Sequence, residues 1–211
     1  MTEQQLAYNL PYEFHDFLTE EKSKYFFDYS VRRVLKDEEG YPKDMELPAC
    51  SILKSRVEEY RAMLHRAGFK LKVLTPAECA YAAVLAFAEE RDDTLRESCI
   101  VALGHSSSHL YIYHGREFDS HREIDIGSAL IAEDQSVDIH VARGYRQKNY
   151  NGVLEADYAR DIYARLAVEV VKAVNFYNYN NRDRELTDVY FCGGDNIGAL
   201  VHAMEENTKL R

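Results

Sequence analysis

The sequence predicts a mixed fold of the α/β (α+β) class, with strands and helices interspersed along 211 residues. Two observations carry this prediction. Residues 98–127 read as three successive strands, because two apolar runs and a third, alternating segment are separated by short breaks rich in Gly, Ser and His. Residues 154–179 carry apolar side chains at every fourth position, which is the period of a helix with one buried face.

The composition indicates a globular protein and argues against two classes of function. Hydrophobic residues make up 46% of the chain and charged residues 29%, a balance that can build a buried core. The net charge of −10 argues against binding to nucleic-acid backbones, which requires a basic surface. No apolar run approaches the roughly 18 residues of a membrane-spanning helix, and the first residues lack a signal-peptide pattern. The four isolated cysteines suit reduced thiols in a cytoplasmic protein.

Residues 1–76 predict a small α+β module behind an aromatic N-terminal stretch. Segments rich in aromatic and β-branched side chains read as strands, and Asp37 to Gly40 reads as a turn. Apolar residues at steps of three and four then indicate an amphipathic helix that ends at Gly68. In order, we expect a strand over residues 25–35, a strand over 45–52, a helix over 53–67 and a half-buried strand over 69–73.

Residues 77–211 predict a second and larger domain, which begins with a well-marked helix start at Thr75-Pro76-Ala77-Glu78. Glu78 suits the third position of a capping box. In order, we expect a helix over residues 77–90, the three strands within 98–127, a broken helical face over 128–150, a helix over 154–179, a short buried strand over 189–192 and a helix over 197–206.

The turn between the first two strands of the second domain is the first candidate site. It contains Gly104, Ser106, Ser107 and Ser108 within the sequence LGHSSSHL. Small hydroxyl residues beside a glycine offer backbone N–H and side-chain O–H groups to a phosphate. The same residue types also suit a plain hairpin turn, so both interpretations stay open.

The eight histidines suggest no metal site. No two of them fall four residues apart on an expected helix with a carboxylate to complete the ligand set. His105 and His109 lie on either side of the hairpin turn, where polar residues are common. The serines of the turn also lack the G-x-S-x-G pattern of a nucleophile elbow, so no catalytic nucleophile is expected.

The order of three features resembles the actin-like (ribonuclease-H-like) ATPase superfamily. These features are the small-residue helix opened by Pro76-Ala77-Glu78, the strand–GHSSS–strand hairpin, and a strand that ends in Gly193-Gly194. More specifically, the chain resembles the PilM family of type IV pilus assembly proteins, which is related to the cell-division protein FtsA. The segments that carry this resemblance are LPYEF, EEYRAMLHRAGFKLKVLTPAECAYAAVL, LGHSSSHLYIYHG, REIDIGSALI, YRQKNYNGVL, VEVVKAVNFYNYNN and DVYFCGG.

The resemblance implies part of an actin-like fold. Residues 1–76 would be an N-terminal segment plus the inserted module that FtsA also has, and residues 77–211 would be most of the second lobe. Gly104 and Ser106 to Ser108 would face phosphate, and Gly193 and Gly194 would let the backbone approach a nucleoside. Glu78 matches a position that helps to orient an attacking water in the family, although the capping box explains it equally.

Three departures from the family pattern bear on nucleotide chemistry. No glycine-rich phosphate-1 loop precedes Leu10, which implies a fragment that lacks the N-terminal phosphate-1 lobe. Ala102 stands where relatives that hydrolyse nucleotides carry a metal-positioning aspartate, and a methyl group cannot hold the waters of Mg²⁺. Asp195 replaces a third glycine, and its charge would repel phosphate. ATP with Mg²⁺ is therefore expected to bind weakly or not at all, and enzymatic activity is not expected.

The function implied is that of a cytoplasmic scaffold in the type IV pilus assembly platform, held at the inner membrane through its partners. Its partner would be a PilN-like membrane protein, whose cytoplasmic N-terminal peptide would lie in a groove beside residues 25–35 and 53–67. Contacts with other platform proteins and self-association are also expected. Two alternatives are an active actin-like ATPase and an FtsA-like filament-forming protein. Arg143 and Arg146 either border the base, as in relatives, or are solvated.

Overall fold

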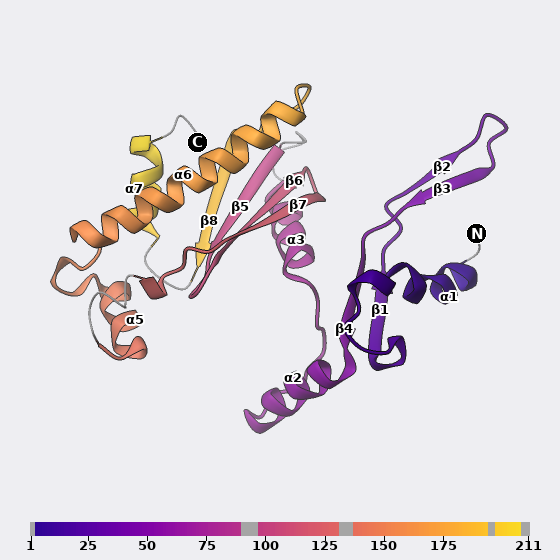
Figure 1. Ribbon diagram of the computed structural model, residues 1–211, viewed down its shortest axis with the longest axis horizontal. Coiled ribbons are helices and arrows are strands. Elements are labelled where there is room, and N and C mark those ends of the chain that lie inside the picture. Colours follow the sequence, from indigo (N-terminus) through magenta and orange to yellow (C-terminus); the bar gives the residue numbers. More distant parts are fainter. Residues whose placement is uncertain (1–2, 90–96, 131–136, 194–196, 208–211) are drawn as a thin grey trace. The chain divides into compact units, whose positions relative to one another are not determined.

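The computed structural model of the chain describes residues 3–89, 97–130, 137–193 and 197–207. The chain divides into two compact units, residues 1–76 and 77–211 (Figure 1). Each unit has its own arrangement of helices and strands, and the assignment of the two units to an inserted module and a second lobe stays a prediction.

The first unit is built on two short antiparallel ribbons. β1 pairs with β4, from Tyr25 opposite Leu53 to Tyr29 opposite Ala49, and β2 pairs with β3. Asp37 opens the turn between β2 and β3, where its Oδ1 accepts hydrogen bonds from the backbone N–H groups of Glu39 and Tyr41. The elements are α1 (Glu3–Glu13), β1 (Tyr25–Tyr29), β2 (Arg33–Lys36), β3 (Pro42–Glu46), β4 (Ala49–Leu53) and α2 (Lys54–Arg66), with single 3-10 turns at His15–Phe17 and Lys22–Lys24.

The continuous strands expected over residues 25–35 and 45–52 are each broken in two. Pro48 lies at the break and cannot donate a hydrogen bond to a ladder, because proline has no backbone N–H. The two chains nevertheless stay together there. The N–H of Ser30 donates to the carbonyl of Pro48 at 3.1 Å, and the N–H of Arg32 donates to that of Glu46 at 2.9 Å.

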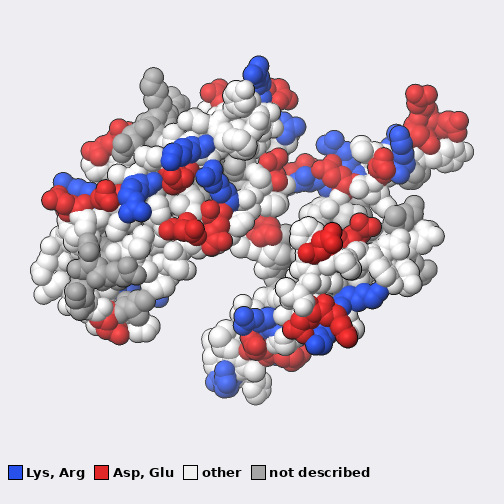
Figure 2. Space-filling view, in the orientation of Figure 1, with Lys and Arg blue, Asp and Glu red and all other residues white. Residues whose placement is uncertain are grey.

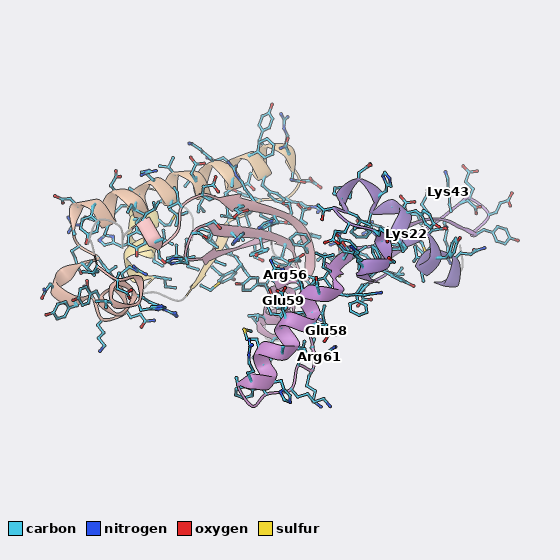
Figure 3. All side chains as sticks on the ribbon, turned by 60° about the horizontal axis from the view of Figure 1, so that its bottom comes forward. Lys22, Lys43, Arg56, Glu58, Glu59 and Arg61 are labelled. Atoms are coloured by element: carbon cyan, nitrogen blue, oxygen red, sulfur yellow. The ribbon has the colours of Figure 1, made fainter. Side chains whose placement is uncertain are left out.

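Helix α2 begins and ends within one residue of the predicted bounds. Its exposed side is crossed by two ion pairs at a spacing of three residues, Arg56–Glu59 at 2.8 Å and Glu58–Arg61, whose labelled side chains lie along the helix in Figure 3. After Gly68, the N–H of Phe69 donates to the carbonyl of Leu64 at 2.8 Å and closes the helix end.

The strand expected over residues 69–73 is not formed, and this prediction was wrong. The segment is irregular, and Phe69 and Val73 are 67% and 75% exposed. Alternating side chains produce a strand only where a neighbouring strand supplies hydrogen bonds. In the described part of the chain, no strand pairs with this segment.

The second unit contains a four-stranded sheet in the order β7-β6-β5-β8. β5, β6 and β7 form an antiparallel meander, which confirms the three strands predicted within residues 98–127. β8 lies parallel to β5, with Ser98 opposite Asp188 and Leu103 opposite Gly193. The strands are β5 (Glu97–Leu103), β6 (Ser108–His114), β7 (Glu117–Ile124) and β8 (Asp188–Gly193).

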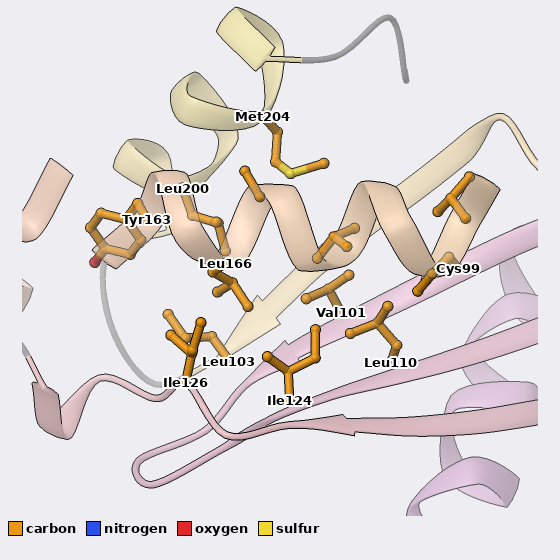
Figure 4. Packing of buried hydrophobic residues seen from close by; sticks show 14 of the residues in the cluster. Cys99, Val101, Leu103, Leu110, Ile124, Ile126, Tyr163, Leu166, Leu200 and Met204 are labelled. Atoms are coloured by element: carbon orange, nitrogen blue, oxygen red, sulfur yellow. The ribbon is translucent and has the colours of Figure 1, made fainter. Parts of the chain in front are cut away.

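Helices cover both faces of this sheet. Alternate residues of β5, including Val101 and Leu103, enter a core with α6 residues such as Leu166, as Figure 4 shows. On the opposite face, Ile100 of β5 packs with Leu85 of α3 in a smaller cluster. The helices are α3 (Ala77–Glu89), α5 (Ile139–Lys148), α6 (Asp157–Asn180) and α7 (Gly198–Asn207).

Several bounds differ from the prediction. The helix expected from Leu154 begins at Asp157, because Leu154 lies in a turn where its N–H donates to Oδ1 of Asn149 at 3.0 Å. β8 is half-buried rather than buried. The helical face expected over residues 128–150 becomes α5 in its second half, and residues 131–136 lie outside the described part.

The surface and the helices carry mixed charge. On the outer side of α6, acidic and basic groups pair, with Lys172 Nζ 2.7 Å from Oε1 of Glu169, and Figure 2 shows both signs interspersed on the visible face.

Among the described helices, none is long and apolar enough to cross a membrane.

Candidate functional site

The turn between β5 and β6 is built tightly around Gly104. A Cβ atom at this position would lie 2.3 Å from the carbonyl oxygen of Ser107, so no other residue fits without moving the backbone. The turn is also fixed from outside. The carbonyl of Gly104 accepts from the N–H of Ser128 at 3.0 Å, and that of His105 accepts from Ala129 at 2.8 Å. The need for glycine therefore follows from the fold of the turn itself.

The three serines of the turn have different environments. Ser106 is exposed, whereas Ser107 is partly buried with its Oγ 3.4 Å from Nε2 of His109. Ser108 is fully buried, and its hydroxyl donates to the carbonyl of Ile126 at 2.6 Å. That hydroxyl holds the turn against the segment that follows β7 and is not presented to a phosphate. The prediction of a phosphate contact is thus better suited to Ser106 and Ser107.

Gly193 lies beside the same turn, although it is far away in the sequence. It is opposite Leu103 in the parallel ladder of β5 and β8. A Cβ atom on Gly193 would lie 2.6 Å from the carbonyl oxygen of Leu103, so glycine is needed where the two strands approach closely. The fold thus brings Gly104 and Gly193 together where the parallel strands β5 and β8 end. Gly194 and Asp195 lie outside the described residues.

Ala102 lies near the end of β5, opposite His109 on β6 and Cys192 on β8. Its methyl group packs against the smaller cluster on the α3 side, which includes Tyr81. The Sγ of Cys192 lies 3.5 Å from the phenol oxygen of Tyr81. The pKa of Tyr81 is raised mainly by burial and secondly by the contact with this thiol. The position at which relatives would present a metal-positioning carboxylate is therefore apolar and supplies no oxygen ligand from Ala102.

Glu78 lies in the first turn of α3. Its backbone carbonyl accepts a 2.7 Å hydrogen bond from the phenol of Tyr113, which ties α3 to β6. This contact involves the main chain, so it assigns no role to the Glu78 carboxylate. Burial, and to a lesser extent the charge of Glu78, raises the pKa values of Tyr111 and Tyr113. The role predicted for Glu78 in orienting water remains a prediction.

A row of aromatic rings on the α3 side of the sheet was not found by sequence reasoning. His109 Nδ1 lies 3.1 Å from His121 Nε2, across β6 and β7. His121 stacks on Tyr111 with ring centroids 4.9 Å apart, and Tyr111 contacts Tyr81 at 5.1 Å. A search for metal ligands at helical spacing misses such pairs, because cross-strand neighbours depend on register.

The two arginines of α5 differ in environment. Arg143 is exposed, as expected for a solvated side chain. Arg146 is only 1% exposed and is one of the largest fully buried side chains, so the interpretation that it is solvated was wrong. Arg146 lies four residues after Ala142, which is also fully buried, so both face the interior from one side of α5.

Comparisons with known proteins give structural matches only. No family model matches the chain, and no curated protein matches it. A solved structure described as the "PilM-PilN type IV pilus biogenesis complex" matches with a TM-score of 0.69 and 17% identity, over 97% of this chain and 61% of that chain. The ethanolamine utilization protein EutJ from Carboxydothermus hydrogenoformans matches at 0.43, with 16% identity over 82% of this chain and 77% of its own. An archaeal actin homolog matches at 0.46, with 15% identity over 67% and 50%.

The first of these matches establishes the fold. It extends over nearly all of this chain, which spans about three fifths of the length of the matched chain. The predicted α/β class and the resemblance to PilM are thus confirmed as a likeness of fold.

Proposed function

We propose that this chain is a PilM-like scaffold of a type IV pilus assembly platform, which binds the cytoplasmic N-terminal peptide of a PilN-like membrane protein. The observation that carries the proposal is the fold match to the PilM-PilN structure, which includes both compact units. Through that partner the chain would be held at the cytoplasmic face of the inner membrane. Other platform proteins would bind the remaining surface.

The environment of Ala102 supports a scaffold rather than an active ATPase. A hydrated Mg²⁺ ion normally rests on one or two carboxylates together with the phosphates, and the methyl group of Ala102 lies instead among apolar and thiol groups. Gly104 and Gly193 are explained by backbone packing, and the Ser108 hydroxyl is used within the fold. Any ATP would therefore be held weakly through Ser106, Ser107 and the backbone of the turn.

The first unit carries exposed apolar side chains on both segments that the proposed peptide groove requires. Phe26 of β1 and Leu35 of β2 are exposed, as are Tyr60 and Met63 of α2. Both ribbons of this unit are two-stranded, so in the described residues each strand keeps an unpaired edge. An extended apolar peptide is the kind of ligand that binds such edges through backbone hydrogen bonds and side-chain pockets.

The experiment is an anisotropy titration of the full chain with a fluorescent peptide that has the cytoplasmic N-terminal sequence of a PilN-like protein. Met63→Glu places a charge on the exposed apolar side of α2, and we expect it to weaken binding at least tenfold. Phe176→Glu is the matched control, because Phe176 is equally an exposed apolar residue but lies on α6 in the second unit. No binding by the unmodified chain, or equal weakening by both variants, would contradict the proposal.

A further inference from the structure

We propose that His109 and His121 form a binding site for a late first-row transition-metal ion such as Zn²⁺ or Cu²⁺. The two imidazoles project from neighbouring strands on the α3 side of the sheet, with Nδ1 of His109 3.1 Å from Nε2 of His121. Neutral imidazole is the ligand that these ions favour. The site is independent of the proposed scaffold function.

The separation of the two nitrogen atoms suits one shared metal ion. A metal–nitrogen bond of about 2.0–2.1 Å places two neighbouring ligand atoms about 2.9–3.4 Å apart at the usual bond angles. The observed 3.1 Å falls within that interval. Binding therefore requires no change in the distance between the strands. The rings must turn, and the proton that Nε2 of His121 donates to Nδ1 of His109 must move to the other ring nitrogen of His121. Two lone pairs then converge on the ion.

Ser107 is placed to hold the ligating tautomer of His109. Its Oγ lies 3.4 Å from Nε2 of His109 and can accept the proton of that nitrogen. The other nitrogen, Nδ1, then carries the lone pair that faces His121. A hydrogen bond to the second ring nitrogen is the common means by which proteins orient a metal-binding histidine. Ser107 thus acts as a positioning residue and links the metal site to the turn.

The surroundings of the pair favour a cation. Glu123 lies directly opposite His109 in the ladder. The ring of Tyr111 stacks on His121. The pKa of Tyr111 is raised mainly by burial and also by the negative charges of Glu78 and Glu123, which act on this same region. Within the described residues, no group of three His, Cys, Asp or Glu side chains gathers around a common point. Water therefore completes the coordination, and the site is open and exchangeable rather than a closed structural centre.

Calorimetric titration of the full chain with Zn²⁺ tests the proposal. We expect binding of one ion per chain, and at least a tenfold loss of affinity in His109→Gln and in His121→Gln. Ser107→Ala keeps both ligands and should lower the affinity only a few-fold. The control is His140→Gln, which removes an exposed histidine at the start of α5 and should leave the titration unchanged.

Electron paramagnetic resonance with Cu²⁺ supplies a second readout that does not depend on stability. The unmodified chain should show coupling to two imidazole nitrogens, and each single variant should show coupling to one fewer. Circular dichroism of both variants checks that their secondary structure is kept. Unchanged Zn²⁺ affinity in either variant, or a Cu²⁺ spectrum that is the same in all proteins, would overturn the proposal.

Discussion

Tyr177 of α6 donates a 2.7 Å hydrogen bond from its phenol to Oε2 of Glu97, the first residue of β5. The other oxygen of the same carboxylate contacts Nδ1 of His114 on β6. Glu97 is only 8% exposed, so these two contacts replace the water that a carboxylate would otherwise bind. The pKa of Tyr177 is raised mainly by burial and secondly by its contact with Glu97, so the phenol stays protonated and donates its hydrogen bond at neutral pH. The pair fastens the long helix to the start of β5.

Tyr177→Phe should destabilise the second unit, because it leaves a buried carboxylate oxygen without its donor. The expected loss is about 1–3 kcal/mol in the free energy of unfolding, measured by urea denaturation at pH 7. Tyr179→Phe is the matched control, because Tyr179 lies on the same helix but is 70% exposed. Equal stability of the two variants would show that the Glu97 contact contributes nothing.

Ser108→Ala and Ser106→Ala should differ in their effect on the free energy of unfolding. The first change removes a buried hydroxyl that donates to the carbonyl of Ile126, and it should cost about 1–2 kcal/mol of unfolding free energy. The second change removes an exposed hydroxyl and should be neutral within about 0.5 kcal/mol. Thermal denaturation of both variants measures this difference, and a neutral Ser108→Ala would contradict the structural role assigned to that side chain.

The chain should bind no ATP that calorimetry can detect at millimolar nucleotide with Mg²⁺, because Ala102 supplies no oxygen to the metal. Ser106→Asp is a better control than a change at Gly104. Any side chain at Gly104 would collide with the carbonyl of Ser107, whereas Ser106 is exposed and tolerates a charge. Heat of binding that Ser106→Asp abolishes would show that the turn still holds phosphate, and would favour the nucleotide-binding alternative.

The contrast between predicted and observed elements has a physical origin. β5 and β6 were predictable because both faces of the sheet are covered there, so their apolar residues run almost without a break. The edge strand β7 is mostly exposed and was predictable from its alternation instead. The alternation in residues 69–73 is equally regular, but a strand also needs a partner, which local sequence does not reveal. The break at Pro48 follows from a missing backbone N–H, which the expected strand over residues 45–52 did not take into account.

The candidate site was predictable only where a local sequence signal marks it. Gly104 and Gly193 stand out in the sequence because turns and close approaches exclude side chains, and the fold places both beside Leu103. Their glycine identity alone does not separate packing from ligand binding. The His109–His121 pair depends on the register between β6 and β7, and twelve residues of sequence separate its members. Only the three-dimensional ladder brings them together.

Cys99 should make the stability of the second unit depend on alkaline pH. Its side chain is fully buried in the core under α6, and burial raises the pKa of the thiol from 9.0 to about 12. The folded state therefore keeps the thiol protonated while the unfolded chain loses its proton above about pH 9. The protonated thiol therefore contributes its full stabilisation of the folded state below about pH 9, and this contribution is lost as the pH rises toward 12. The free energy of unfolding falls by at most about 1.4 kcal/mol per pH unit over this range.

Urea denaturation of the unmodified chain and of Cys99→Ala between pH 7.5 and about 10.5 measures this dependence. Cys99→Ala carries a cavity cost that does not vary with pH, whereas only the unmodified chain loses the thiol contribution. The stability difference between the two proteins should thus narrow steadily above about pH 9. The tyrosines titrate in both proteins and cancel in that difference. A difference that stays constant across the whole range would mean that the Cys99 thiol ionises as readily in the folded core as in water, contrary to its full burial against α6.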